Sequence, residues 1–245
     1  LDVAETLGIS TICSWSLGGR MTDLISDSSF LTALLCSYLI GAIPFSYIIA
    51  RLNGVDLLKV GSGNPGATNL SRNLGKKLGA IGLGFDLLKG VVPVLLAPVF
   101  LSEQFHTGEH LPVLFALAVG AAAIIGHCFS PFLLGKGGKG VATTAGVLLA
   151  YEPWLAISML IFWGVALMKI RSVGISSVVA ALGGALLGAT MMAQVFSFGS
   201  ILVNSGSVED QRRLGLTLVI ICLLIVIRHR SNIREYREAR SAASS

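Results

Sequence analysis

The sequence is poor in charged residues, which make up only 13% of its 245 positions. In a soluble domain about a quarter of the residues are charged. Hydrophobic residues account for 53% of the chain, and the mean hydropathy is +0.79. This balance excludes an ordinary soluble domain and predicts an integral membrane protein.

Several kinds of chemical site are also missing from the sequence. The four cysteines, at positions 13, 36, 128 and 222, are too widely spaced to suggest a zinc site or a disulfide framework. There is no HExxH motif, no pair of catalytic carboxylates and no G-x-S-x-G elbow. Any chemistry must therefore rest on cations, amides and hydroxyls.

Long apolar runs are abundant, and a membrane-spanning helix needs roughly 20 such residues. Pro44 should kink the first run, and Tyr151-Glu152-Pro153 should divide the run 141–168 into two helices. The predicted spans are residues 30–52, 78–100, 111–134, the two halves of 141–168, 173–203 and 214–227. The fold class that follows is an all-α integral membrane protein with about seven transmembrane helices.

The net charge of +5 could suggest a nucleic-acid partner, but the basic residues lie between apolar runs rather than on one solvated face. They instead indicate topology, because Lys and Arg are concentrated in cytoplasmic loops. One side of the predicted membrane domain collects Arg51, Lys59, Arg72, Lys76, Lys77, Lys136, Lys139, Lys169, Arg171, Arg228, Arg230, Arg234, Arg237 and Arg240. The other side has Arg20, Arg212 and Arg213 with most of the acidic loop residues. This predicts an outside amino terminus and a cytoplasmic carboxy terminus.

The sequence is predicted to divide into three segments. Residues 1–29 form an amino-terminal extension, with Met21 as an alternative start. Residues 30–228 form one membrane domain, and residues 229–245 form a basic cytoplasmic tail.

Residues 60–72 form a glycine-rich polar loop between the first two spans, V-G-S-G-N-P-G-A-T-N-L-S-R. Gly61, Gly63 and Gly66 permit positive φ angles, so that successive N–H groups can form an anion-binding nest. Further donors are available from Ser62, Asn64, Thr68, Asn69 and Arg72. The alternative is a flexible interhelical linker.

A second polar cluster, G-H-C-F-S-P-F-L-L-G-K-G-G-K-G-V-A-T, follows the third predicted span. It is not a P-loop, because Val141 stands where Ser or Thr is required and no strand precedes it. Two lysines can bind a phosphate group, and the glycines between them permit its close approach. The candidate phosphate-binding residues are Lys136, Gly137, Gly138, Lys139 and Gly140. The alternative is that the lysines only anchor a cytoplasmic loop.

Three other polar residues lie within the second and third predicted spans. His127 is a candidate base, although a lone histidine at a helix end is more often structural. Asp86 and Lys89 are three positions apart on the second span, where charges are costly unless paired. Structural pairing is therefore preferred to direct chemistry.

The third polar cluster, R-H-R-S-N-I, begins where the last span ends. Its basic residues could simply contact anionic headgroups. His229 and Asn232 are three apart on a continued helix, and could instead reach the pocket formed by the two loops.

These three clusters, in this order between these spans, resemble the signature regions of the bacterial acyl-phosphate:glycerol-3-phosphate acyltransferases. The resemblance covers roughly residues 31–234. It implies a seven-helix enzyme of the bacterial cytoplasmic membrane, with its active site facing the cytoplasm. The enzyme would transfer a fatty acyl group from acyl phosphate to glycerol 3-phosphate, giving lysophosphatidic acid without a metal or cofactor.

The resemblance also implies roles for individual residues. Ser62, Arg72, Lys139, His229 and Asn232 correspond to the functional residues of the family. Asn69, Lys136 and the surrounding glycines would line the phosphate sites. Because both substrates carry phosphate and acyl phosphate is already activated, the enzyme would mainly neutralise, orient and stabilise. The leaving phosphate would take the proton.

The sequence departs from the family pattern after Asn232. Glu235 and Tyr236 replace an expected Arg-Leu pair, and Ser241 stands about where a glutamate is usual. Glu238 is a candidate substitute for that acid. Ser172 fits a further family motif, whereas Ile175 occupies the position of its second serine.

Two other classes of function compete with the enzyme. A small transporter for an anionic solute could use Asp86, Lys89 and glycine-rich helices as a path, although the polar clusters gather at one face and no inverted repeat is visible. A noncatalytic lipid-binding scaffold would tolerate Lys-to-Arg exchanges and Gly63→Ala.

Overall fold

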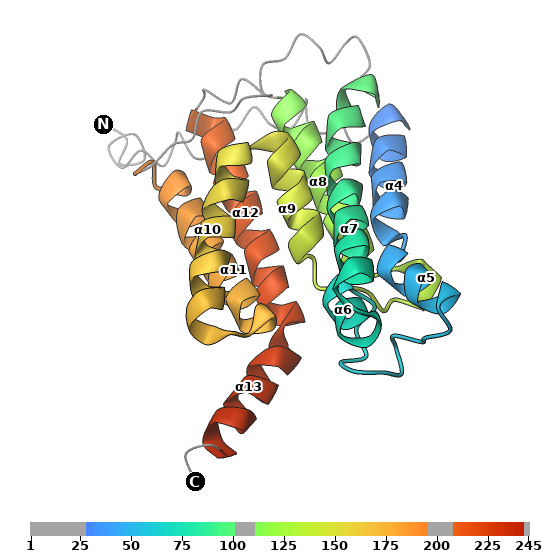
Figure 1. Cartoon of the computed structure of the whole chain (residues 1–245). Helices are drawn as coiled ribbons and strands as arrows, with labels where there is room; N and C mark the ends of the chain where they lie inside the picture. The colour runs from blue at the N-terminus through green and yellow to red at the C-terminus, as the bar shows by residue number, and fades with distance from the viewer. Residues whose placement is uncertain (1–27, 101–110, 196–207, 243–245) are drawn as a thin grey trace, which may run out of the picture.

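The computed structural model describes residues 28–100, 111–195 and 208–242, and all regular structure in these ranges is helical. The helices pack side by side as a bundle (Figure 1). In chain order they are α4 (Ser28–Ala42), α5 (Phe45–Leu52), α6 (Ala67–Leu74), α7 (Lys76–Leu96), α8 (Leu111–Cys128), α9 (Val141–Tyr151), α10 (Pro153–Ile170), α11 (Val173–Met192), α12 (Val208–Arg228) and α13 (Arg230–Ala242). Short 3-10 turns follow α7 (Ala97–Phe100) and α8 (Pro131–Leu133).

Five segments in the described ranges are long and apolar enough to cross a membrane, and six if α12 and α13, bent by 52°, count as one span. The five are Ser28–Leu52, Lys76–Val99, Val113–Leu133, Pro153–Ile170 and Val173–Met192. The remaining apolar helix, α9, has only 11 residues. A membrane-type helical fold is therefore observed, while the number of crossings stays a prediction.

Two prolines act as the sequence predicts. Pro44 separates α4 from α5, because it has no N–H group to continue the helix. Pro153 occupies the first turn of α10, directly after Glu152, which ends α9. The division of residues 141–168 into two helices is confirmed, and it returns the chain to the end of the bundle from which α9 started (Figure 1).

The predicted third span, 111–134, agrees with the apolar segment Val113–Leu133, although its regular helix ends at Cys128 because the chain turns at Ser130-Pro131. Two other predicted ends differ from the structure. α11 ends at Met192, with Gln194 at a positive φ of 59°; residues 196–203 lie outside the described ranges. α12 begins at Val208, six positions before Leu214.

The early start of α12 has an electrostatic reason. Glu209 and Asp210 lie in its first turn, where negative charge is favourable for the helix dipole. Arg213, one turn later, contacts Glu209 Oε1 at 3.3 Å and Asp210 Oδ1 at 3.7 Å. A charged stretch that resembles a loop in the sequence is thus a stable helical turn.

Glycines allow the helices to approach closely. A Cβ at Gly126 of α8 would lie 2.1 Å from the Tyr38 carbonyl oxygen of α4. A Cβ at Gly188 of α11 would lie 2.6 Å from the carbonyl oxygen of Gly215 on α12. The predicted role of Gly188 in close packing is confirmed, as expected where small residues mediate helix contacts in membranes.

One end of the bundle carries most of the polar chain. The loop 53–66 with α5 and α6, the connection 129–140 after α8, and α13 all lie at the lower end in Figure 1. The three polar clusters of the sequence therefore meet at this end.

Candidate active site

The first polar loop is folded around the side chain of Asn69. Its Nδ2 lies 3.1 Å from the carbonyl oxygen of Leu57 and 3.0 Å from those of Val60 and Asn64. Its Oδ1 accepts a hydrogen bond of 3.2 Å from the N–H of Ser62. Asn69 is buried, so its amide holds the loop in shape rather than offering donors at the surface, where the sequence placed it.

The glycines of this loop behave in two ways. Gly61 and Gly63 have positive φ angles of 57° and 65°, as expected for the predicted nest. Gly66 has a φ of −98° and serves as the N-cap of α6, so the expected positive φ is wrong there.

The predicted donors of the first loop remain accessible. The side chains of Ser62, Thr68 and Arg72 are exposed, and Arg72 lies in the last turn of α6. Asn64 is half-buried and joins the two loops: its Oδ1 accepts from the N–H of Gly66 at 3.0 Å, and its Nδ2 donates to the carbonyl of Gly137 at 3.4 Å. The first loop is thus connected directly to the second.

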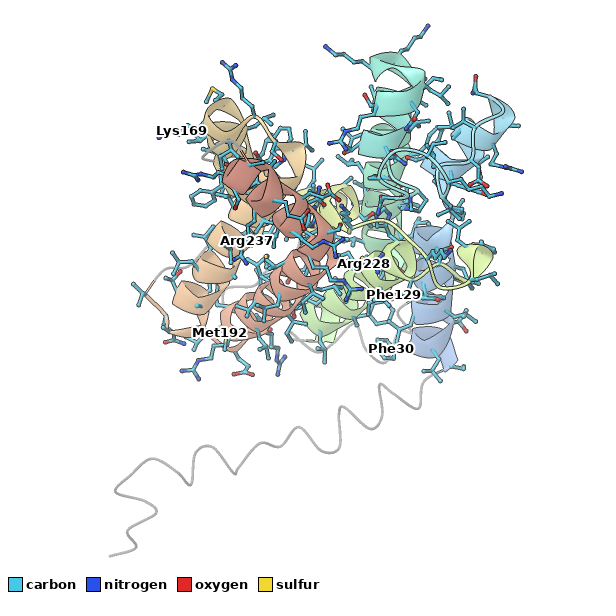
Figure 2. The ribbon with its side chains drawn as sticks, turned by 90° about the horizontal axis from the view of Figure 1, so that it is seen from below. Phe30, Phe129, Lys169, Met192, Arg228 and Arg237 are labelled. Carbon is cyan, nitrogen blue, oxygen red and sulfur yellow. The ribbon has the colours of Figure 1, made fainter. Side chains whose placement is uncertain are left out.

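The second loop is held by Arg228, at the end of α12. Its guanidinium donates to the carbonyl of Gly137 at 2.9 Å and to that of Gly138 at 3.2 and 3.0 Å. The guanidinium carbon also lies 5.1 Å above the ring of Phe129. Figure 2 shows these two residues side by side in the view from below.

Arg228 is a residue whose role the sequence did not reveal. It belongs to the R-H-R-S-N-I cluster, but only the later His and Asn of that cluster were assigned to the site. Its contacts with Gly137 and Gly138 join segments about 90 positions apart. No local pattern could have predicted that pairing.

Lys139 and Asn232 bring the third cluster into the site. The Nζ of Lys139 donates to Oδ1 of Asn232, which lies in the first turn of α13. Gly174, near the start of α11, leaves room for this amide: a Cβ there would lie 2.3 Å from Asn232 Nδ2. Gly140, with a φ of 86°, follows Lys139 and is the N-cap of α9.

Burial lowers the pKa of Lys139. The carboxylate of Glu235 acts against this shift, whereas the guanidiniums of Arg72 and Arg228 add to it. Three charged groups, from α6, α12 and α13, therefore act on the half-buried ammonium of the second loop. Glu235, rather than Glu238, is the tail acid whose charge reaches it; Glu238 lies 3.9 Å from Arg234.

The other residues assigned to the site differ in access. His229 is buried, and its Nδ1 lies 2.8 Å from the carbonyl oxygen of Ile225, which leaves Nε2 as the ring atom not engaged by its own helix. Lys136 is exposed. Its carbonyl accepts a hydrogen bond of 3.3 Å from the N–H of Ser130.

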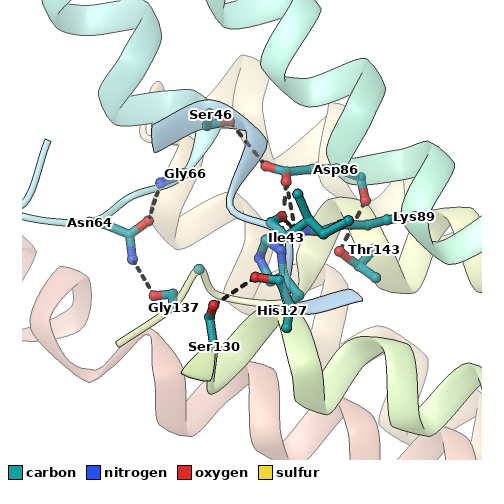
Figure 3. A network of polar contacts seen from close by, with 12 residues as sticks. Ile43, Ser46, Asn64, Gly66, Asp86, Lys89, His127, Ser130, Gly137 and Thr143 are labelled. Atoms are coloured by element: carbon teal, nitrogen blue, oxygen red, sulfur yellow. Dashed lines mark hydrogen bonds and ion pairs between the residues drawn. The ribbon is translucent and has the colours of Figure 1, made fainter. Parts of the chain in front are cut away.

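A buried polar network lies beneath the loops (Figure 3). Lys89 Nζ contacts Asp86 Oδ1 at 3.0 Å and donates to the carbonyl of Ile43, beside the Pro44 break, at 3.0 Å. Ser46 donates to Asp86 Oδ2 at 3.2 Å, and Thr143 donates to the Asp86 carbonyl at 3.0 Å. The structural pairing of Asp86 with Lys89 is confirmed, and it ties α5, α7 and α9 together.

His127 belongs to this network rather than to the open site. Its Nδ1 lies 3.7 Å from Asp86 Oδ1, and its carbonyl accepts the N–H of Gly138 at 2.9 Å. Gly138 lies directly against its ring, because a Cβ there would be 2.0 Å from Nε2. A cavity of about 10 Å³ beside it, lined in part by Asp86, Lys89 and Ser130, is about the size that one water needs. The ring supports the second loop, which favours the structural reading of His127 over the catalytic one.

Among the described residues, no group of three His, Cys, Asp or Glu side chains is placed to hold a metal ion. The site instead combines cations, amides, hydroxyls and backbone N–H groups. These groups bind and stabilise oxyanions such as phosphate.

The electrostatics of Lys139 predict a pH dependence. Only the protonated ammonium can stabilise an anion, so activity that uses Lys139 should fall as the pH rises through its lowered pKa. We expect Lys139→Arg to be slower than the parent, because a guanidinium does not replace an ammonium in geometry, and to move the alkaline limb of its remaining activity upward, because a guanidinium stays protonated there. The measurement is a profile of kcat/KM against pH for both proteins, and superimposable alkaline limbs would contradict the assignment.

Comparison with known proteins gives consistent matches over nearly the whole described chain. The sequence model of the family described as "Glycerol-3-phosphate acyltransferase" matches residues 31–239. The glycerol-3-phosphate acyltransferase of Endomicrobium trichonymphae is 38% identical over 210 residues, which cover 84% of this chain and 90% of that protein. Glycerol-3-phosphate acyltransferase 1 of Deinococcus radiodurans is 40% identical over 207 residues, with the same coverage of 84% and 90%.

Solved structures agree with these matches. The crystal structure of PlsY (YgiH), an integral membrane glycerol 3-phosphate acyltransferase, in its glycerol 3-phosphate form is 32% identical, with a TM-score of 0.69 over 87% of this chain and 94% of that one. The lysophosphatidic acid form is 33% identical, with a TM-score of 0.66 and the same coverage of 87% and 94%.

Proposed function

Because this chain belongs to the glycerol-3-phosphate acyltransferase family, we propose that it transfers a fatty acyl group from acyl phosphate to glycerol 3-phosphate. The products are lysophosphatidic acid and phosphate, and the reaction serves phospholipid synthesis. The observation that carries the proposal is the convergence of three distant polar segments through Asn64–Gly137, Arg228–Gly138 and Lys139–Asn232.

The reaction needs little covalent help from the protein. The 1-hydroxyl of glycerol 3-phosphate attacks the acyl carbonyl carbon, a new ester C–O bond forms, and the C–O bond to phosphate breaks. The hydroxyl proton passes to the leaving phosphate, which keeps charge and atoms balanced. The catalytic task is to bring two anions together and to stabilise the negative charge on the carbonyl oxygen.

Each candidate residue has a part in that task. Ser62 and Arg72, exposed beside the positive-φ glycines Gly61 and Gly63, bind phosphate oxygens. Lys139 supplies the half-buried positive charge. Asn232, together with His229 Nε2, orients glycerol 3-phosphate. The remaining candidates, Asn64, Gly66, Thr68, Lys136, Gly137, Gly138 and Gly140, shape or line the pocket, and Asn69 holds its first loop.

The membrane placement is part of the proposal. α4 with α5, then α7, α8, α9, α10, α11 and α12, make seven crossings, with the amino terminus outside the bacterial cytoplasmic membrane. The basic end that carries the site faces the cytoplasm, following the distribution of Lys and Arg. At 1.5 Å per residue α9 is only about 17 Å long, against a hydrocarbon core of about 30 Å. The loop that precedes α9, residues 135–140, then lies within the membrane rather than at its cytoplasmic surface. At that depth it can contact the phosphate group of acyl phosphate.

The proposal is tested by the release of phosphate from the purified protein. The parent protein should release phosphate from acyl phosphate only when glycerol 3-phosphate is present, and lysophosphatidic acid should appear in equal amount. Ser62→Ala and Arg72→Ala should each reduce the rate by about 10²-fold, as expected for the loss of one charge-stabilising group. Full activity in both variants would refute the site, and no release by the parent would refute the enzyme.

A further inference from the structure

A groove separate from the candidate active site runs between α11 and α13. Its volume is about 700 Å³, within the range of roughly 300–1,000 Å³ that is usual for ligand sites. It is lined by Ile175, Val178 and Leu182 of α11, Val226 of α12, and Ile233, Tyr236, Arg237, Arg240 and Ser241 of α13.

The α13 side of the groove is a single helix face. The lining positions 233, 236, 237, 240 and 241 follow the spacing of three and four that places side chains on one side of a helix. Glu235 and Glu238 fall outside this stripe, and Glu238 lies 3.9 Å from Arg234. α13 therefore turns Arg237 and Arg240 toward the groove and its two acids away from it.

The opposite wall is apolar. Ile175, Val178 and Leu182 stand at intervals of three and four on α11, a helix apolar enough to cross a membrane. Leu182 is 54% exposed, so this wall is open on its outer side. The groove thus joins an apolar wall on a spanning helix to two guanidiniums at its polar end.

The two guanidiniums are available for an anion. Among the residues that the structure describes, neither Arg237 nor Arg240 forms an ion pair with an acidic side chain. None of the residues of α13 is buried. The helix nevertheless carries the site residue Asn232 in its first turn. A ligand in the groove would hold this helix against α11.

We propose that this groove binds one anionic phospholipid of the surrounding bilayer. The lipid phosphate contacts Arg237 and Arg240, and an acyl chain lies along the apolar wall of α11. Basic clusters just cytoplasmic of a spanning helix attract anionic lipids, and this cluster adds an apolar wall beside the charge. Lipid binding rests on the membrane placement given above, whereas the effect of the lipid on acyl transfer rests on the proposed function.

The bound lipid should also increase the rate of acyl transfer. Asn232 accepts the hydrogen bond from Lys139, so the orientation of α13 controls how that amide meets the second loop. Arg237 and Arg240 lie about 8 and 12 Å along the helix from Asn232, at 1.5 Å per residue. Anionic lipid that fixes α13 should therefore increase acyl transfer without occupying the site of chemistry.

The test uses the full chain in nanodiscs of phosphatidylcholine with a trace of photoactivatable phosphatidylglycerol. Irradiation followed by peptide mass spectrometry should place crosslinks on α11 and α13. Arg237→Gln and Arg240→Gln should each lower crosslinking at least tenfold, and Val178→Trp should lower it while leaving the charge unchanged. Arg234→Gln is the matched control, with the same loss of charge on the same helix, and should change it less than twofold.

Three results would overturn the proposal. Equal loss in Arg234→Gln would mean general attraction to a basic helix. Unchanged crosslinking in Arg237→Gln and Arg240→Gln would mean that the groove does not select the headgroup. Crosslinking that acyl phosphate displaces, and that Arg72→Ala abolishes, would mean that the groove belongs to the substrate. Ser62→Ala and Arg72→Ala should otherwise keep full crosslinking, so a failure of the proposed reaction remains distinguishable.

Discussion

Replacing Lys139 with methionine is expected to lower kcat/KM for acyl transfer by about 10²- to 10³-fold. Lys139 is the half-buried cation of the site, and its Nζ bonds Asn232 at the start of α13. Methionine keeps an unbranched side chain but has no charge and no donor. In the proposed reaction, the site would then lose an ammonium that stabilises negative charge. The measurement is the initial rate of lysophosphatidic acid formation over a range of both substrates.

The matched control for this variant is Lys169→Met. Lys169 is exposed in the last turn of α10, at the same end of the bundle but outside the site (Figure 2). Its loss changes the net charge equally, and the rate should stay within about threefold, since distant exposed charges are screened. Equal losses in the two variants would mean that Lys139 acts only through the overall charge of the cytoplasmic face.

The sequence was sufficient to predict the helical architecture because apolar length and proline act locally. Pro44 and Pro153 divide their segments as expected, and the two-helix reading of residues 141–168 brings Lys139 and Lys169 to the same end. Helix ends were less predictable where charged residues form the end of the helix. At the start of α12, Glu209 and Arg213 stabilise a turn that an apolar pattern cannot reveal.

The site, like the fold, was predictable from the sequence only in part. Glycines with positive φ and exposed donors were predictable from residue type, and Gly61, Gly63 and Ser62 fit that prediction. The buried contacts were not, because Arg228 pairs with residues about 90 positions away and the contacts of Asn69, although within 12 positions, depend on the folded shape of its loop. Asn69 resembles a phosphate ligand in the sequence, yet its amide is used by the loop, and Arg228 resembles a headgroup anchor, yet it holds Gly137 and Gly138.

The polar loops depend on the charged pair beneath them. Asp86 and Lys89 side chains are only 5% and 3% exposed, and they contact the Pro44 break and α9. His127 connects this pair to Gly138 of the second loop. The pair therefore supports the geometry of the site from inside the bundle.

Asp86→Asn is expected to destabilise the folded protein by about 3 kcal/mol, since removing one partner leaves the other charge buried and unpaired. Lys89 Nζ would keep its hydrogen bond to the Ile43 carbonyl but would lose its ion pair with the Asp86 carboxylate, 3.0 Å away. The double variant Asp86→Asn/Lys89→Met removes both charges and should recover at least half of that loss. Unfolding of the purified proteins in mixed detergent micelles gives the free energies, and the difference between single and double variants isolates the coupling. A double variant less stable than the single one would contradict the ion-pair reading, because it would make Lys89 stabilising without its partner.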